Sequence, residues 1–240
     1  MSNLNPPIKY TLAKQSNKGI YFAVLLIAVW FLVMAVAFMV NVNLASVGNW
    51  LMVLLLTHLY TGLFITAHDA IHGTVSWNRR VNIWVGRLCT TLFMFNSFSL
   101  LARKHNEHHQ FAGTPKDPDY HPPFVVLWYL RFLKEYVSIR QIVLAAITFN
   151  VLKLFVPTEN LLLFWILPSV LSTMQLFLFG TYLPHRGEHD NRHNARSQPN
   201  NHLIAFISCY FFGYHYEHHD SPGTPWWMLY KVKEQGEQNH

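Results

Sequence analysis

GIYFAVLLIAVWFLVMAVAFMV, from Gly19 to Val40, is a run of residues without a single charge. A helix needs roughly 20 apolar residues to cross the hydrocarbon core of a bilayer. Trp50–Ala67 and Leu161–Leu183 are runs of similar character, and Ile142–Pro157 is a weaker fourth candidate. A soluble core can explain one such run, but three in a chain of 240 residues indicate an integral membrane protein.

The composition supports the same class of protein. Hydrophobic residues make up 51% of the chain and charged residues only 12%, whereas a soluble domain carries about 25% charged residues. We therefore expect an all-α membrane protein with one domain over residues 1–240, about four transmembrane helices and further interfacial or re-entrant helices. The expected segments are a polar N-terminal tail at 1–18 and transmembrane helices at 19–40, 50–68, 139–157 and 161–184.

The distribution of Lys and Arg predicts the orientation. If the N-terminus is cytoplasmic, the outer loops are Asn41–Asn49 and Pro157–Asn160, and neither contains Lys or Arg. Lys153 is the exception to a cytoplasmic bias, and its long side chain can reach the outer interface. The positive-inside rule therefore favours cytoplasmic termini in a bacterial inner or internal membrane. The same bias explains the net charge of +6, so nucleic acid is not needed to account for it.

Two apolar segments are not expected to cross the bilayer. Val81–Leu101 is of near-spanning length but carries Arg87. A crossing there would place His72 and His105 on opposite faces, so we expect this segment to lie in, or dip into, the cytoplasmic interface. Leu203–Tyr214 is too short to span and is expected to rest on the same interface.

Three histidine-rich phrases accompany the apolar segments: HDAIH at His68–His72, HNEHH at His105–His109 and HYEHH at His215–His219. A helix places residues i, i+3 and i+4 on one face, so each phrase is expected to present its imidazoles as one cluster. All three phrases fall on the cytoplasmic side in the expected topology. The expected metal ligands are His68, His72, His105, His108, His109, His215, His218 and His219.

The number and type of these side chains predict two metal ions. Imidazole suits zinc, copper, iron and nickel. A single structural zinc takes four ligands that usually include cysteine, so eight imidazoles favour a pair of irons that activates dioxygen. Glu107 and Glu217 fall on the opposite faces of their helices, and we expect each to orient a neighbouring phrase or to pair with a base.

A ninth ligand is expected among His185, His189 and His193, which are spaced by four residues. Pro184 and Gly187 argue against one continuous helix through this segment. His185 ends the last expected span at the depth of the other phrases, and it is therefore the favoured candidate.

The order HxxxH, HxxHH, HxxHH on a four-span chain resembles the membrane di-iron superfamily of desaturases, alkane hydroxylases and carotenoid oxygenases. The flanking residues resemble the bacterial-type β-carotene ketolases more closely, from about Phe64 to Trp227. The segments that carry this resemblance are FITAHDAIHGTV, KHNEHHQFAGTPKDPDYH, QLFLFGTYLPHR, RHNARS and GYHYEHHDSPGTPWW.

This resemblance implies oxidation of the ring methylene at carbon 4 of β-carotene to a ketone, which gives echinenone and canthaxanthin. Family chemistry implies successive hydroxylations at one carbon and loss of water from the geminal diol. The implied cofactors are two iron ions, with dioxygen as co-substrate. Electrons must come from an external carrier such as ferredoxin, because the chain has no Gly-rich nucleotide-binding loop.

Further site residues are expected around the ligands. Carboxylates commonly accept the second N–H of a ligating imidazole, and three Asp residues near the histidines are candidates for this role. Their alternative role is loop capping or pairing with Arg103 or Lys104. Trp226 and Trp227 either line a pocket for the ring end or anchor the chain at the interface. The candidate carboxylates are Asp69, Asp117 and Asp119.

Two other functions fit parts of this pattern. A membrane fatty-acid desaturase or hydroxylase, or a carotenoid hydroxylase, would use the same histidines, and only the flanking residues favour the ketolase. A histidine-rich metal transporter or sensor is a different class of protein. It is disfavoured because transporters place polar groups near the middle of the bilayer, whereas these histidines gather at one face.

Overall fold

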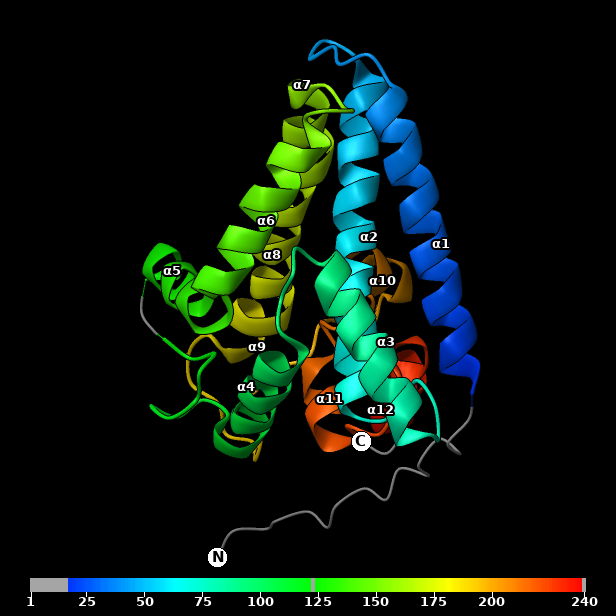
Figure 1. The fold of residues 1–240 in the computed structure, drawn as a ribbon. Helices are drawn as coiled ribbons and strands as arrows, with labels where there is room; N and C mark the ends of the chain where they lie inside the picture. The colour runs from blue at the N-terminus through cyan, green and yellow to red at the C-terminus, as the bar shows by residue number, and fades with distance from the viewer. Residues whose placement is uncertain (1–16, 122–123, 239–240) are drawn as a thin grey trace, which may run out of the picture.

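Long helices carry the apolar runs in the computed structural model, which describes residues 17–121 and 124–238 (Figure 1). Helices α1 (Lys18–Met39) and α2 (Val47–Ile71) form a pair joined by a short link. A third long helix runs over Thr158–His185 and packs against α2. Its parts are α7 (Thr158–Asn160), η1 (Leu161–Ile166), α8 (Leu167–Phe177), η2 (Leu178–Tyr182) and α9 (Leu183–His185).

The two η segments of the third helix are wider π-helical turns, and each ends two residues before a proline. Pro168 and Pro184 lack an amide hydrogen, and a proline ring displaces the carbonyl four residues earlier. The helix accommodates both prolines by widening locally instead of ending. It therefore reaches His185 without a break.

The fourth apolar run follows a sharp bend in the chain. The expected span at 139–157 corresponds to α6 (Ile139–Leu152), which has 14 residues and is too short to cross alone. It is preceded by α5 (Val125–Tyr136), and the two helices meet at 84°. Ser138 caps α6 by accepting the Gln141 N–H. By length and composition the described residues hold three spans, or four if this bent pair counts as one.

The segment expected at the interface forms a helical hairpin. Helix α3 (Arg79–Leu92) packs against α2, and the chain turns at Phe93–Ser97 into α4 (Phe98–Phe111). Met94 and Phe95 adopt positive φ values of 54° and 61°, which gives the sharp turn. The hairpin returns the chain to the end of α2, where His72 and His105 are adjacent.

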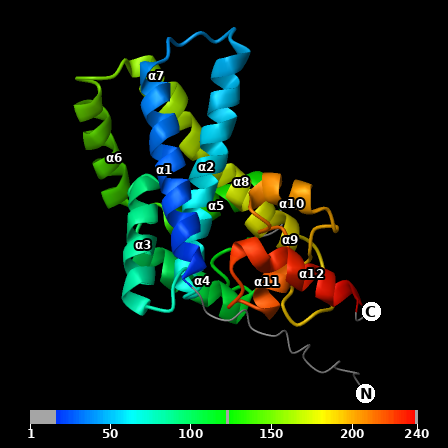
Figure 2. The same cartoon turned by 90° about the vertical axis from the view of Figure 1, so that its right-hand side faces the viewer.

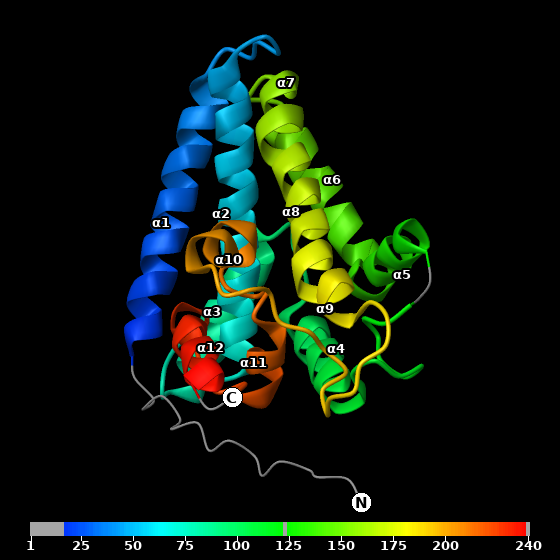
Figure 3. The same ribbon diagram turned by 180° about the vertical axis from the view of Figure 1, so that it is seen from behind.

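The C-terminal elements are short. The first lies about half-way along the bundle, and the later ones gather at the end opposite the α1–α2 link (Figures 2 and 3). Gln175 of α8 donates to the carbonyls of Ile207 and Ser208, which lie at the end of α10 and lack helical partners. This bond fixes α10 against the third long helix. The elements are α10 (His202–Cys209), α11 (His215–Asp220), η3 (Trp226–Met228) and α12 (Leu229–Gln238).

Candidate metal centre

Nine imidazoles converge where the end of α2 meets α4, α9 and α11, and they form two groups. Within each group, one ring nitrogen of every residue lies within 4.8 Å of the others. The first group contains His68, His72, His105, His109 and His218. The second group contains His108, His185, His215 and His219.

The two HxxHH phrases are divided between the groups, which corrects the expectation that each phrase forms one cluster. On α4, His105 and His109 join the first group while His108 joins the second. On α11 the division is reversed. His218 joins the first group, and His215 and His219 join the second. Positions i+3 and i+4 of a helix point about 100° apart, so one phrase can serve two adjacent centres.

The distances between ring nitrogens suit ligands of a shared ion. The Nε2 atoms of His105 and His109 are 2.9 Å apart, and those of His185 and His215 are also 2.9 Å apart. Two nitrogens about 2.1 Å from one ion and at right angles to each other are about 3 Å apart. Nε2 of His108 lies at similar distances, 3.0 Å from Nε2 of His219 and 3.3 Å from Nε2 of His215.

Burial keeps most of these side chains in the neutral form that binds metal. Burial lowers the pKa of His72 to about 4. Burial, followed by the nearby imidazoles, lowers the pKa of His109 to about 2. An imidazole with a lowered pKa is neutral at physiological pH and offers a lone pair to a cation. The donor set therefore fits two divalent transition-metal ions. His108 is the exception among the ligands, because burial lowers its pKa but the carboxylates of Asp119 and Asp117 outweigh burial and raise it.

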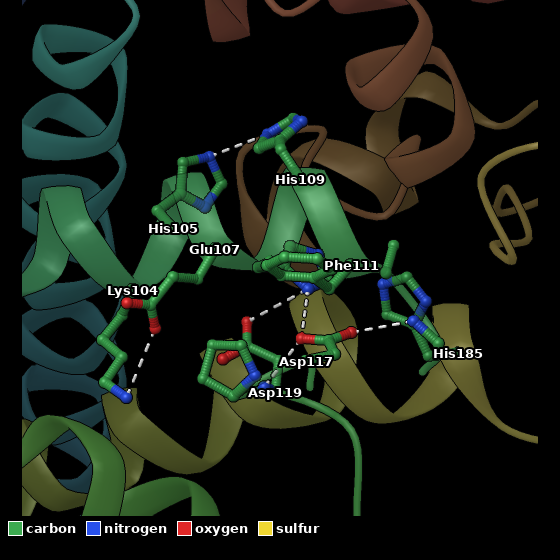
Figure 4. A network of polar contacts seen from close by, with 12 residues as sticks. Lys104, His105, Glu107, His109, Phe111, Asp117, Asp119 and His185 are labelled. Carbon is green, nitrogen blue, oxygen red and sulfur yellow. Dashed lines mark hydrogen bonds and ion pairs between the residues drawn. The ribbon is translucent and has the colours of Figure 1, made fainter. Parts of the chain in front are cut away.

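Asp117 orients His108 by accepting a hydrogen bond from the ring nitrogen that faces away from the other imidazoles (Figure 4). Nδ1 of His108 donates to Oδ1 of Asp117 over 2.9 Å, which leaves Nε2 as the lone-pair donor toward the second group. The other carboxylate oxygen of Asp117 accepts the Gly113 N–H. Burial alone would raise the pKa of Asp117. The hydrogen bond and charge of His108, together with the backbone N–H groups of Asp119 and Gly113, outweigh burial and hold that pKa below its ordinary value.

Asp119 lies further from His108 than Asp117 does. Its Oδ2 is 3.8 Å from Nδ1 of His108, beyond hydrogen-bond distance, and its Oδ1 accepts the hydroxyl of Tyr136. Burial raises the pKa of Asp119 to about 6, against the charge of His108. Its backbone carbonyl accepts the indole N–H of Trp128, so the loop is tied to α5.

Of the three candidates for a ninth ligand, the structure brings only His185 into a group. Its Nδ1 donates to the Asn194 carbonyl over 2.7 Å, which turns Nε2 toward His215. His193 instead lies beside Asp220, with 3.1 Å between Nε2 and Oδ1. His189 belongs to neither group.

Asp69 makes no hydrogen bond to an imidazole, and Trp226 and Trp227 pack against α1. Oδ1 of Asp69 is 3.8 Å from Nδ1 of His68, too far for a hydrogen bond, because consecutive helical residues point in different directions. Its Oδ2 accepts the backbone N–H of Trp226 and so ties η3 to α2. Trp226 and Trp227 pack on Phe22 of α1, and neither lines the cavity beside the histidines.

Both glutamates of the HxxHH phrases pair with a base. Glu217 accepts the Ser197 hydroxyl and lies 3.3 Å from Nζ of Lys233 on α12. Glu107 lies 3.5 Å from Nζ of Lys104, which is also bonded to Glu135 (Figure 4). Neither glutamate belongs to an imidazole group.

A cavity of about 20 Å³ lies against both groups, touching His68, His105, His108 and His215. This volume is room for about one molecule of the size of water. Of the other residues in this wall, sequence reasoning identified Asp119 alone, because no motif marks the rest and they come from separate elements. The rest are Phe64, Leu101, Phe132, Tyr136, Leu176, Gly180, Thr181 and Phe212.

A helical bundle with membrane-spanning helices and two histidine groups at one end defines a class of integral membrane metalloprotein. The chain belongs to the fatty acid desaturase family, whose sequence model matches residues 45–155 and 127–238. Within that family it groups with the carotenoid ketolases, as the identities to individual relatives show.

A β-carotene ketolase from a Paracoccus species is 42% identical over 76% of this chain and 78% of the relative. A zeaxanthin 4-ketolase from Chlamydomonas reinhardtii is 40% identical over 75% of this chain, but this match spans only 43% of that longer relative. A dihydrorhizobitoxine desaturase from Bradyrhizobium elkanii is 27% identical over 76% of this chain and 66% of the relative. Identity is therefore higher toward these ketolases than toward this desaturase.

Proposed function

We propose that this protein is a β-carotene 4-ketolase, an oxidoreductase that converts the ring methylene at carbon 4 to a ketone. The observation that carries the proposal is the pair of imidazole groups facing an apolar-walled cavity. The 42% identity to a β-carotene ketolase supports this reaction and substrate. Two hydroxylations of the same carbon followed by loss of water account for the product.

Each imidazole group would hold one iron ion. Two bound irons would supply the oxidation of the C–H bond by dioxygen. The chain's own part is to present ring nitrogens toward each ion, with His108 oriented by Asp117 and His185 oriented by the Asn194 carbonyl. Phe64 and Phe212 wall the cavity and limit the entry of water beside the reacting carbon. A soluble carrier such as ferredoxin would supply the electrons.

Expression in cells that accumulate β-carotene tests this function directly. We expect echinenone and canthaxanthin to appear, as separated and identified by chromatography of the pigments. Cells with the empty vector provide the control. If the iron-loaded protein left β-carotene unchanged, or made only hydroxylated pigments, the ketolase proposal would be wrong. A desaturated or hydroxylated fatty acid as the sole new product would favour the alternative function.

The histidine end is proposed to face the cytoplasm of a bacterial inner or internal membrane. Ser46 lies in the α1–α2 link, at the opposite end of the bundle from the loop that contains Gln198. Reporter fusions at Ser46 and Gln198 should therefore give opposite signals, with the cytoplasmic signal at Gln198. Equal signals at both positions would reject the proposed topology.

A further inference from the structure

A second, larger cavity lies within the spanning part of the bundle, between α1, the α3–α4 turn, α6 and the third long helix. Its volume is about 340 Å³. Apart from Thr91 and Thr148, all the residues that line it are apolar. Phe31 on its rim is 52% exposed, so the cavity opens on the outer surface of α1. Because α1 is a candidate span, that opening faces the bilayer.

Aromatic side chains connect this cavity with the small one beside the histidines. Trp30 lines the larger cavity and meets Tyr60 with ring centroids 5.5 Å apart. Tyr60 meets Phe93 at 6.0 Å, and Phe93 meets Phe64 at 5.7 Å. Phe64 lines the small cavity together with His68. Tyr60 and His68 are eight positions apart on α2, which corresponds to about 12 Å along the helix axis.

The α3–α4 turn contributes one side chain to this row and two to the wall of the larger cavity. Phe93 is 4% exposed and points into the bundle between Tyr60 and Phe64. Met94 and Phe95, the next two residues, line the larger cavity. Their consecutive positive φ values turn the chain sharply enough to place successive side chains on the two sides. Phe93 thus stands between the two cavities.

The proposed substrate does not fit the small cavity alone. β-Carotene is a long conjugated hydrocarbon with a ring at each end, and a cavity of about 20 Å³ cannot hold even one ring without movement of its walls. When one ring lies beside the histidines, the rest of the molecule needs apolar surroundings that extend toward the bilayer. The larger cavity offers such surroundings, beginning at Trp30, which meets Tyr60 about 12 Å along α2 from His68.

We propose that the larger cavity binds the polyene and far ring of the carotenoid during the reaction, with Phe93 between it and the reacting ring. This inference rests on the proposed function and assigns a binding site to residues outside the histidine centre. It also makes α1 and α6 determinants of substrate length. A shorter apolar substrate would reach the histidines without occupying this cavity.

Two tryptophan substitutions with adjacent controls test the inference. Ala35 and Thr148 line the cavity, whereas their neighbours Val36 and Ile147 do not line it and are exposed. At matched protein level and iron content, Ala35→Trp and Thr148→Trp should each lower ketone yield about tenfold, because the indole fills the cavity. The same variants should lower the amount of β-carotene that copurifies with the protein. Val36→Trp and Ile147→Trp should match wild type in both measurements.

Copurified β-carotene is measured separately from ketone yield, so the two proposals can fail independently. A wild-type protein that retains β-carotene, loses it in the two cavity variants and forms no ketone would overturn the proposed function alone. Cavity variants that match their controls in both measurements would overturn the binding site. Loss of copurified phospholipid from the cavity variants, with β-carotene unchanged, would show that the cavity holds a lipid chain instead and would also overturn it.

Discussion

Replacing His218 by alanine is expected to abolish ketone formation and to remove iron from the first imidazole group. Nε2 of His218 lies 3.2 Å from that of His68 and 3.0 Å from that of His109, so its loss opens the middle of that group. The second group keeps its own four imidazoles. We therefore expect the purified variant to hold about half of the wild-type iron, as measured by elemental analysis at matched protein concentration.

The unequal sizes of the two groups sharpen this prediction. Nε2 of His72 contacts that of His105, and His72→Ala leaves four imidazoles in the first group with His218 still among them, whereas His185→Ala leaves three in the second. His185→Ala should therefore lose more iron than His72→Ala. Equal and complete loss of iron from both variants would contradict the division into two separate groups.

Glu217→Gln is the matched control on the same helix. Its partners are Ser197 and Lys233, and it touches neither imidazole group. The variant should keep its iron and at least part of its activity, because glutamine still offers an oxygen to the Ser197 hydroxyl. If Glu217→Gln lost iron as completely as His218→Ala, Glu217 would have to be a ligand and the arrangement of α11 proposed here would be wrong.

Asp117→Asn is expected to lower iron affinity or activity by about 10- to 100-fold, the usual cost of losing a carboxylate that orients a ligating imidazole. The neutral amide accepts the His108 N–H less strongly, and its NH₂ group can instead donate to that nitrogen and turn the ring. Competition with a chelator would measure the affinity, and pigment analysis would measure the activity.

Asp69→Asn provides the comparison for Asp117→Asn. Asp69 is equally buried and adjacent to His68, but its carboxylate accepts the backbone N–H of Trp226 instead of an imidazole N–H. Its replacement should leave iron affinity close to the wild-type value. A larger loss of iron from Asp69→Asn than from Asp117→Asn would contradict the roles proposed for the two carboxylates.

The sequence by itself determined the helices and the position of the histidines along them. The run beginning at Gly19 predicted a spanning helix, and α1 covers Lys18–Met39. The HxxHH spacing predicted helical phrases, and both lie on helices, α4 and α11. These features depend on local properties, namely apolar length and the repeat of the α-helix. The pairing of Glu107 with Lys104 is also local, because the two residues are three apart on α4, whereas the pairing of Glu217 with Lys233 joins α11 to α12.

Only the tertiary structure decided how these helical pieces combine. The bend between α5 and α6 depends on packing around the bundle, and the run 139–157 alone does not contain it. His185 joins the second group because the third long helix ends beside α11 and the Asn194 carbonyl turns its ring. The phrases on α4 and α11 divide between two groups because their helices face each other across the site, and Asp69 binds Trp226 because η3 returns to α2. Such contacts join residues far apart in the chain, and their geometry is set by the packing of whole helices, which no local sequence pattern specifies.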